Sequence, residues 1–160
     1  MGFIQGLVAF LGRILISFIF IASGVHQILD WQGTEQRFVT AINDWNALMI
    51  ADESLRNMLA TALSWSSLLV AGAIFCQLIG GLLILLGIQI RFGAFLLILF
   101  LASATLLFHH FWMLIGPERN MQMIEFMKNM SMLGGLFILL AYGKGKKTPP
   151  RESSSPKENS

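Results

Sequence analysis

Long apolar stretches alternate with shorter polar segments along this chain of 160 residues. An apolar stretch of roughly 20 residues predicts a membrane-spanning helix, because each helical residue rises about 1.5 Å and the hydrocarbon layer is about 30 Å thick. The predicted spans lie at about residues 7–29, 66–88, 91–113 and 121–142. The pattern therefore predicts an all-α fold, in which residues 1–142 form a four-helix bundle embedded in a membrane.

The second and third spans are joined by a short segment around residues 89–91, which predicts an antiparallel hairpin. The last apolar core, Met130–Tyr142, is too short to cross a membrane by itself. The fourth span is therefore expected to begin at about Met121. This extension brings Glu125, Lys128 and Asn129 of the fourth span into the outer layer of the membrane.

Arg13 interrupts the first apolar stretch, so a secretory signal peptide is an alternative to a span. Arg13 would be its basic region, Ile14–Ile21 its apolar region and Ala22–Gly24 its cleavage site. An uncleaved span is the simpler interpretation, because apolar residues also precede Arg13 and three further spans follow. The side chain of Arg13 would then extend toward the near membrane surface.

The segment between the first two spans, residues 30–64, is polar and contains five acidic residues and two arginines. Apolar residues recur in it at helical spacing, which predicts two short amphipathic helices that lie on the membrane or pack against the bundle. The two stripes consist of Phe38, Ile42, Trp45 and Met49, and of Leu55, Met58, Leu59 and Leu63. Asp52 is the expected N-cap of the second helix.

The composition supports a membrane location, since 55% of the residues are hydrophobic and 12% are charged, against about 25% charged residues in soluble domains. The net charge of +2 does not indicate nucleic-acid binding, because five basic residues lie in the last 17 positions. Residues 143–160, rich in Pro, Ser and Lys, are interpreted as a disordered basic tail. With Arg13 and Arg91, this tail predicts cytoplasmic termini and an extracytoplasmic acidic segment. No organelle-targeting feature is present, which favours a bacterial inner membrane.

The second span combines small residues with one strongly polar group. Gly72, Cys76 and Gly80 recur at four-residue spacing, which predicts a face on which helix backbones approach closely. Cys76 is the only cysteine of the sequence, so an intramolecular disulfide and a cysteine-based zinc site are excluded. Gln77 lies near the middle of the span and is expected to need a hydrogen-bonding partner on another helix.

Polar residues from three spans are expected to meet at the outer end of the bundle, beneath the acidic segment. They are His26, Gln27 and Asp30 of the first span, His109 and His110 of the third, and Glu125, Lys128 and Asn129 of the fourth. Ionisable groups in spans usually point toward a partner or a cavity, so we expect a ligand site there. The candidate ligand-binding residues are His26, Gln77, His109, His110, Trp112, Glu125, Lys128 and Asn129.

Simpler interpretations of these residues are open. Histidines beside Trp112 are typical of the aromatic belt at a membrane surface, and Glu125 and Lys128 can neutralise each other's charge. No metal site is predicted, because the spacing matches neither HExxH nor the Glu-x-x-His pairs of di-iron bundles. A quinone or another lipid-like ligand, in an apolar pocket with one or two polar donors, fits better.

In these residues the chain resembles the DoxX family of small four-helix membrane proteins, over roughly residues 10–142. The matching segments are Leu11–Arg13, Ala22–Gly24, Leu29–Asp30, Gln77–Leu83, Gly87, Arg91, Ala104–Trp112, Lys128–Asn129 and Leu133–Leu136. The order and spacing of these segments carry the resemblance more than any single motif does. Family members usually have a lysine where this chain has His26 or Gln27, and a glutamate where it has Gln77.

The resemblance implies a membrane subunit of an oxidoreductase system, of the kind found in sulfur-compound–quinone reactions or oxidative-stress complexes. It does not imply that this chain is itself an enzyme. In this interpretation quinone is the ligand, a soluble or membrane redox partner docks on the protein, and Lys128, His109 and His110 orient or protonate the ligand. The alternatives are a non-catalytic scaffold, a chaperone-like adaptor or a lipid-handling protein. A transporter ranks third, because four spans leave little room for a pathway unless the protein is a homo-oligomer.

Overall fold

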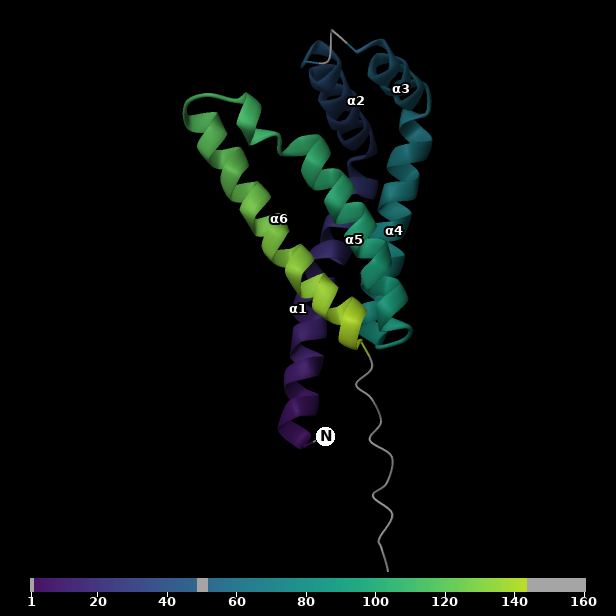
Figure 1. Cartoon of the computed structure of the whole chain (residues 1–160). Coiled ribbons are helices and arrows are strands. Elements are labelled where there is room, and N and C mark those ends of the chain that lie inside the picture. The colour runs from purple at the N-terminus through teal and green to yellow at the C-terminus, as the bar shows by residue number, and fades with distance from the viewer. Residues whose placement is uncertain (1, 49–51, 144–160) are drawn as a thin grey trace, which may run out of the picture.

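The computed structural model describes residues 2–48 and 52–143, which form helices joined by short turns (Figure 1). The elements in chain order are α1 (Phe3–Leu29), α2 (Trp31–Leu48), α3 (Glu53–Ser64), α4 (Ser66–Leu86), α5 (Ile90–Phe108), the 3-10 helix η1 (Phe111–Met113) and α6 (Pro117–Tyr142). No strand occurs in these described residues, so the predicted all-α fold is confirmed. Met49 of the predicted stripe and residues 144–160 of the predicted tail lie outside them.

In residues 2–48 and 52–143, four helical segments are long and apolar enough to cross a membrane, as predicted. They are α1, α4, the combined α5–η1 segment Ile90–Met113, and α6. α1 begins at Phe3, earlier than the predicted start at about residue 7. The predicted third span, at about residues 91–113, corresponds to α5 and η1 together. α5 itself ends at Phe108, because the backbone leaves the helical conformation at His109.

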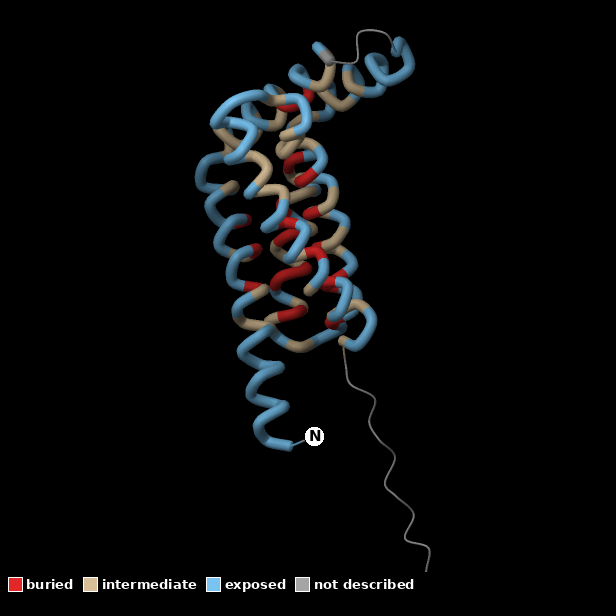
Figure 2. Tube along the Cα trace, turned by 60° about the vertical axis from the view of Figure 1, so that its left-hand side comes forward, coloured by how far each residue is buried: buried red, intermediate tan, exposed pale blue. Residues whose placement is uncertain are grey.

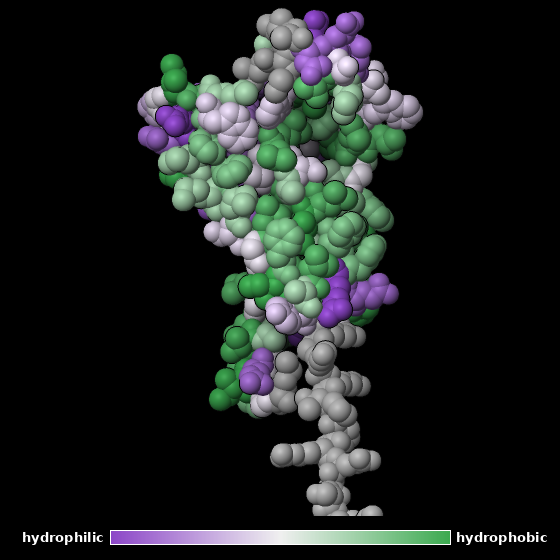
Figure 3. Space-filling view, in the orientation of Figure 1, coloured by the Kyte–Doolittle hydropathy of each residue, from purple (hydrophilic) through white to green (hydrophobic). Residues whose placement is uncertain are grey.

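The spanning helices pack in a simple order, with α1 against α4, α4 against α5, and α5 against α6. Toward the end that carries α2 and α3, α6 diverges from α5 (Figure 1). The buried core runs along the inside of the bundle (Figure 2) and consists of Phe20, Ile84, Ile90, Ala94, Leu97, Leu101, Leu133 and Leu136. Large apolar side chains also cover much of the outer surface (Figure 3), and Phe18, for example, is 70% exposed. A surface of this kind suits lipid and not water.

α4 and α5 approach closely where two glycines face each other. A Cβ atom on Gly80 would lie 2.9 Å from the carbonyl oxygen of Gly93, and a Cβ atom on Gly93 would lie 2.9 Å from the carbonyl oxygen of Gly80. Small residues thus allow the two backbones to meet, as predicted. The prediction that Gly72 belongs to this packing face is wrong, since a Cβ added to Gly72 would have nothing within 4 Å. The close approach of the two helices lies further along α4, at Gly80.

α2 and α3 cap one end of the bundle (Figure 1), and both helices lie where the polar segment predicts them. α2 buries Ala41 and Ile42, whereas α3 has no buried residue. The predicted N-cap is confirmed, since Oδ1 of Asp52 accepts a hydrogen bond of 3.1 Å from the backbone N–H of Leu55. We refer to this end of the molecule as the capped end.

Hydrogen bonds to Glu35 join α2 to the first turn of α4. Its Oε1 accepts one hydrogen bond from the hydroxyl group of Ser67 and one of 2.8 Å from that of Ser66. These bonds, that of Ser67 first, hold the pKa of Glu35 below its ordinary value because they favour the ionised carboxylate. The carboxylate also lies beside the start of a helix, where unpaired N–H groups favour negative charge.

Two arginines mark the opposite, uncapped end of the bundle. The guanidinium group of Arg13 lies against Gly87, which ends α4 with a φ of 71°. Nη2 of Arg91 donates a hydrogen bond of 3.0 Å to the carbonyl oxygen of Ala141, near the end of α6. Arg13 thus lies beside the C-terminal end of α4 and Arg91 beside that of α6, where the helix dipole favours positive charge.

Candidate functional site

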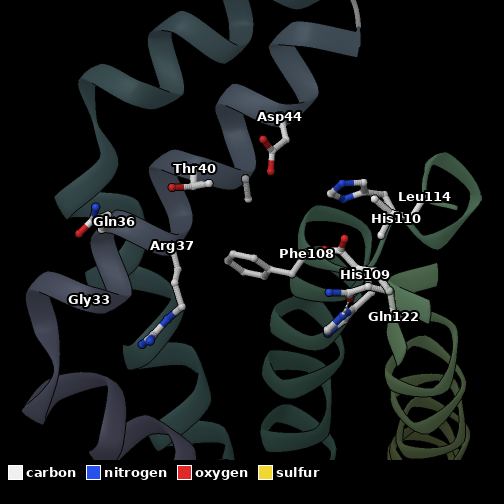
Figure 4. A pocket seen from close by; sticks show the side chains of 12 residues that line it. Gly33, Gln36, Arg37, Thr40, Asp44, Phe108, His109, His110, Leu114 and Gln122 are labelled. Atoms are coloured by element: carbon white, nitrogen blue, oxygen red, sulfur yellow. Dashed lines mark hydrogen bonds between the residues drawn. The ribbon is translucent and has the colours of Figure 1, made fainter. Parts of the chain in front are cut away.

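A groove of about 430 Å³ lies between α2 and the corner at which α5 ends and α6 begins (Figure 4). Its lining consists of Gly33, Gln36, Arg37, Thr40, Ala41 and Asp44 of α2, Phe108, His109, His110 and Leu114 of the corner, and Glu118 and Gln122 of α6. The volume lies within the range of about 300–1,000 Å³ that is usual for small-molecule sites. The groove is at the capped end, the level at which the sequence predicts a ligand site.

His109 is held at the end of α5 by two hydrogen bonds. Its backbone N–H donates to the carbonyl oxygen of Thr105 at 3.0 Å, and its Nδ1 donates to Oε1 of Gln122 at 2.7 Å. An amide oxygen only accepts, so the second bond places the ring proton on Nδ1 and leaves the lone pair of the neutral ring on Nε2. His109 can therefore accept a proton from a bound hydroxyl group, or donate one when the ring is doubly protonated.

Trp45 holds the cap against the corner between α5 and α6. Its indole N–H donates a hydrogen bond of 3.1 Å to the carbonyl oxygen of Leu107. The ring centroid of Trp45 lies 5.7 Å from that of His110 and 6.5 Å from that of Trp112. The aromatic cluster formed in this way consists of Trp45, His110, Phe111, Trp112 and Phe126. It fixes the two walls of the groove relative to each other, because packed aromatic rings have strong geometric preferences.

His110 brings an unpaired polar atom to the groove. Its Nδ1 is enclosed and makes no hydrogen bond with any residue in the described ranges, a condition that is uncommon in folded proteins. Asp44 stands across the groove from His110 (Figure 4). Among residues 2–48 and 52–143, no three His, Cys, Asp or Glu side chains are grouped so that they could hold a metal ion.

Arg37 forms part of the α2 wall and is oriented by two neighbours. Its Nη2 donates to Oδ2 of Asp30 at 3.2 Å and to Oγ1 of Thr34 at 3.0 Å. The side chains of Arg37 and Asp30 are 57% and 47% exposed, so the ion pair contributes little to stability. Asp30 thus supports a groove residue from outside the lining.

The predicted residues of α6 lie beside the groove and not in its lining. Nζ of Lys128 donates to both carboxylate oxygens of Glu125, at 2.8 and 2.9 Å. Glu125 lies near His109. Asn129 is buried, at 9% exposure. The ion pair is therefore a neighbour of the His109 site, although Lys128 does not line the groove.

Gln77 and His26 lie apart from the groove lining. Gln77 is 1% exposed, and its Nε2 donates a hydrogen bond of 2.8 Å to the carbonyl oxygen of Phe20. The expected partner on another helix is thereby confirmed, and Gln77 joins α1 to α4 inside the bundle. His26 is exposed, and its side chain makes no hydrogen bond in the part of the chain that the structure describes.

The structure adds groove residues that were not predicted from the sequence. They are Gln36, Arg37, Thr40, Asp44, Glu118 and Gln122, together with Trp45 behind the wall. The sequence does contain a pattern that indicates this wall of the groove, because Gln36, Thr40 and Asp44 recur every four residues along α2. A polar stripe of this kind on an amphipathic helix indicates either a solvated face or the wall of a site.

Four apolar spanning helices and a helical cap define an integral membrane protein with an all-α bundle. The chain belongs to the DoxX family, because the family model described as DoxX matches residues 8–110, more than half of the chain. The resemblance carried by the motifs is therefore confirmed, although the match ends before α6. Comparison with curated proteins and with solved structures gives no match.

Proposed function

We propose that the protein is the membrane subunit of a quinone-linked redox system and that its groove holds the quinone ring. The observation that carries this proposal is the hydrogen bond between His109 and Gln122, which sets a proton acceptor in the groove. Phe108 and Leu114 supply apolar surface for a ring, and His110 supplies a second titratable group. The groove therefore combines apolar surface for a ring with polar groups that can orient it, as ligand sites do.

The chemistry of a quinol matches the groups that line the groove. Oxidation of a quinol releases two protons and two electrons, and Nε2 of the neutral His109 can accept the first proton. Asp44 and Glu118 also line the groove and are exposed, so that they can pass protons between the groove and water. The electrons go to a redox partner protein, soluble or membrane-bound. Reduction of a quinone uses the same groups in the opposite direction.

We assign the groove to the outer side of a bacterial inner membrane, with both termini in the cytoplasm. In support, Arg13 and Arg91 lie at the uncapped end, opposite the groove. Five further basic residues occur in the sequence after Gly143. Basic residues near span ends favour the cytoplasmic side. The groove then opens at the level of the outer leaflet, from which a membrane-dissolved quinone can enter.

A second function, the docking of a partner protein without redox chemistry, is favoured by α3. This helix has no buried residue, so it contributes little to the core of the fold. Asp52 and Glu53 at its start are exposed, and their negative charge suits a basic partner surface. Here the protein would be an adaptor whose cap is the docking surface.

Variants of the two surfaces separate the two functions. In cells that lack the gene and receive it back on a plasmid, the fraction of reduced quinone in membrane extracts is measured. The proposed redox role predicts that His109→Ala leaves this fraction at the value of the deleted strain, while Asp52→Lys combined with Glu53→Lys restores it. The adaptor role involves no redox chemistry, so it predicts that deletion of the gene leaves this fraction unchanged.

His26→Ala is the matched control, because His26 is an exposed histidine that does not line the groove. It must restore the quinone redox state, and all variants must reach equal protein levels. A deletion that leaves the quinone redox state unchanged contradicts the redox role.

A further inference from the structure

The first turns of α1 extend past the uncapped end of the bundle (Figures 1 and 2). Arg13 lies against Gly87 at the end of α4, so residues 3–12 lie beyond the level at which the other helices turn. All ten of these residues are exposed, and a Cβ added to Gly6 or Gly12 would have nothing within 4 Å. At about 1.5 Å per residue, this segment is about 15 Å long.

The extension is strongly apolar. Its large apolar residues, which are between 47% and 87% exposed, are Phe3, Ile4, Leu7, Val8, Phe10 and Leu11. If α1 continued straight into water, all six side chains would be hydrated, which the hydrophobic effect opposes. The exposed apolar surface of α1 also continues without interruption into the lipid-facing side chains Leu15 and Phe18 of the span, which are 73% and 70% exposed.

The extension has two different sides. Successive residues of an α-helix are rotated by about 100°, which puts the six large apolar side chains on one arc of about 160°. The other arc carries Gln5, Gly6, Ala9, Gly12 and Arg13. A segment that is surrounded by lipid on every side gains nothing from the polar side chains of Gln5 and Arg13 on one arc. A broad apolar face opposite an arc that carries the polar groups is instead typical of a helix that lies in the membrane surface.

We propose that residues 3–12 form an arm that lies along the membrane surface at the uncapped end, with the apolar arc in the acyl chains. The small arc and Arg13 face the headgroups and water. In this arrangement the chain turns from the arm into the span at Gly12, because glycine allows a bend and an added Cβ there would meet no atom within 4 Å. Of the 27 residues of α1, about 17 then cross the membrane, enough for a short span. The bilayer surface is the partner that this arm recognises.

Nitroxide labels at single cysteines test the arm in the full chain, in a Cys76→Ala background, reconstituted into vesicles of phosphatidylethanolamine and phosphatidylglycerol. Collision rates with oxygen and with a water-soluble nickel chelate report the depth of each label. For the arm, labels at Ile4, Leu7 and Leu11 collide more with oxygen, and labels at Gln5 and Ala9 collide more with nickel. Depth then alternates with the helical period and shows no steady trend along the segment.

Labels at Phe92, Phe95 and Leu99 on the exposed side of α5 are the control for a crossing helix, and their depth must change steadily along the chain. A steady change of the same kind from residue 4 to residue 11 overturns the proposal, because α1 would then cross the membrane as one straight helix. Nickel access at every position overturns it as well. If a label at Leu7 disturbs the fold, Val8 on the same arc replaces it.

Discussion

Nδ1 of His109 and Oε1 of Gln122 lie 2.7 Å apart, and their hydrogen bond joins the end of α5 to the second turn of α6. Because the amide oxygen accepts, the proton of the neutral imidazole is on Nδ1, and Nε2 is the atom that can take up a second proton. The acid–base property of the groove therefore depends on the pair and not on the histidine alone.

Gln122→Leu removes the acceptor of this bond and keeps a side chain of similar size. We expect the affinity of the groove for a quinone to fall about fivefold, equivalent to the ~1 kcal/mol that a typical hydrogen bond contributes. Quenching of tryptophan fluorescence during a quinone titration measures the affinity. Gln32→Leu, an exposed change on α2 outside the groove lining, should leave the affinity unchanged. Equal affinities in both variants would show that Gln122 does not orient His109.

Glu35→Gln should make the stability of the fold less dependent on pH below about pH 4.5. Hydrogen bonds from Ser67 and Ser66 lower the pKa of Glu35 in the folded state from its ordinary 4.5. The ionised carboxylate therefore stabilises the fold above about pH 4.5, and this contribution is lost as the pH falls through the lower, folded-state pKa. The thermal unfolding midpoint of the unchanged protein should fall more steeply below pH 4.5 than that of Glu35→Gln. Glu53→Gln should retain the steep fall. If the midpoint of Glu35→Gln falls with pH as steeply as that of the unchanged protein, Glu35 does not contribute this pH-dependent stability.

Trp45→Phe keeps an aromatic ring and removes the indole N–H that bonds to the carbonyl oxygen of Leu107. We expect the free energy of unfolding to fall by about 1 kcal/mol, since one hydrogen bond is lost and a half-buried carbonyl loses its partner. Chemical unfolding in mixed micelles measures this change. Trp65→Phe is the control, because Trp65 is 57% exposed, and it should cost less. A larger loss from Trp65→Phe would mean that Trp45 does not fasten the cap.

Two glycines of α4 should respond in opposite directions to the same substitution. Gly80→Ala pushes a methyl group against the backbone of Gly93, and overpacking of this kind costs about 1–3 kcal/mol. Gly72→Ala meets open space and should stabilise the helix by up to about 1 kcal/mol. Thermal unfolding in detergent compares the two variants, and a loss of similar size in both would show that the Gly80–Gly93 approach does not hold α4 and α5 together.

The spans and the cap are predictable from the sequence because each depends on local pattern. Twenty apolar residues in a row specify a crossing helix whatever the rest of the chain does, and the apolar stripes of residues 30–64 specify helices in the same way. Asp52 is recognisable as an N-cap from its neighbours alone. Even Gln77, polar in an apolar span, had to find a partner on another helix, and it does so at Phe20.

The groove is not predictable in this way, because its walls are set by contacts between distant residues. Trp45 bonds to Leu107, and Glu35 bonds to Ser66, and neither pairing leaves a mark in the local pattern. His109 is recognisable because it ends an apolar run, whereas nothing in the local pattern marks Gln122, at the start of the predicted fourth span, as its partner. The rotation of α1 about its axis, which leaves His26 exposed, also depends on packing that hydropathy does not encode.

Titration of a short-chain quinone into the detergent-purified protein, after extraction of any quinone that copurifies, tests the proposed quinone site most directly. We predict saturable binding that His109→Ala abolishes and that His26→Ala retains. Lys128→Ala should also retain it, because Lys128 pairs with Glu125 outside the groove lining. An unchanged affinity in His109→Ala, or no saturable binding by the folded protein, would contradict the proposed quinone site.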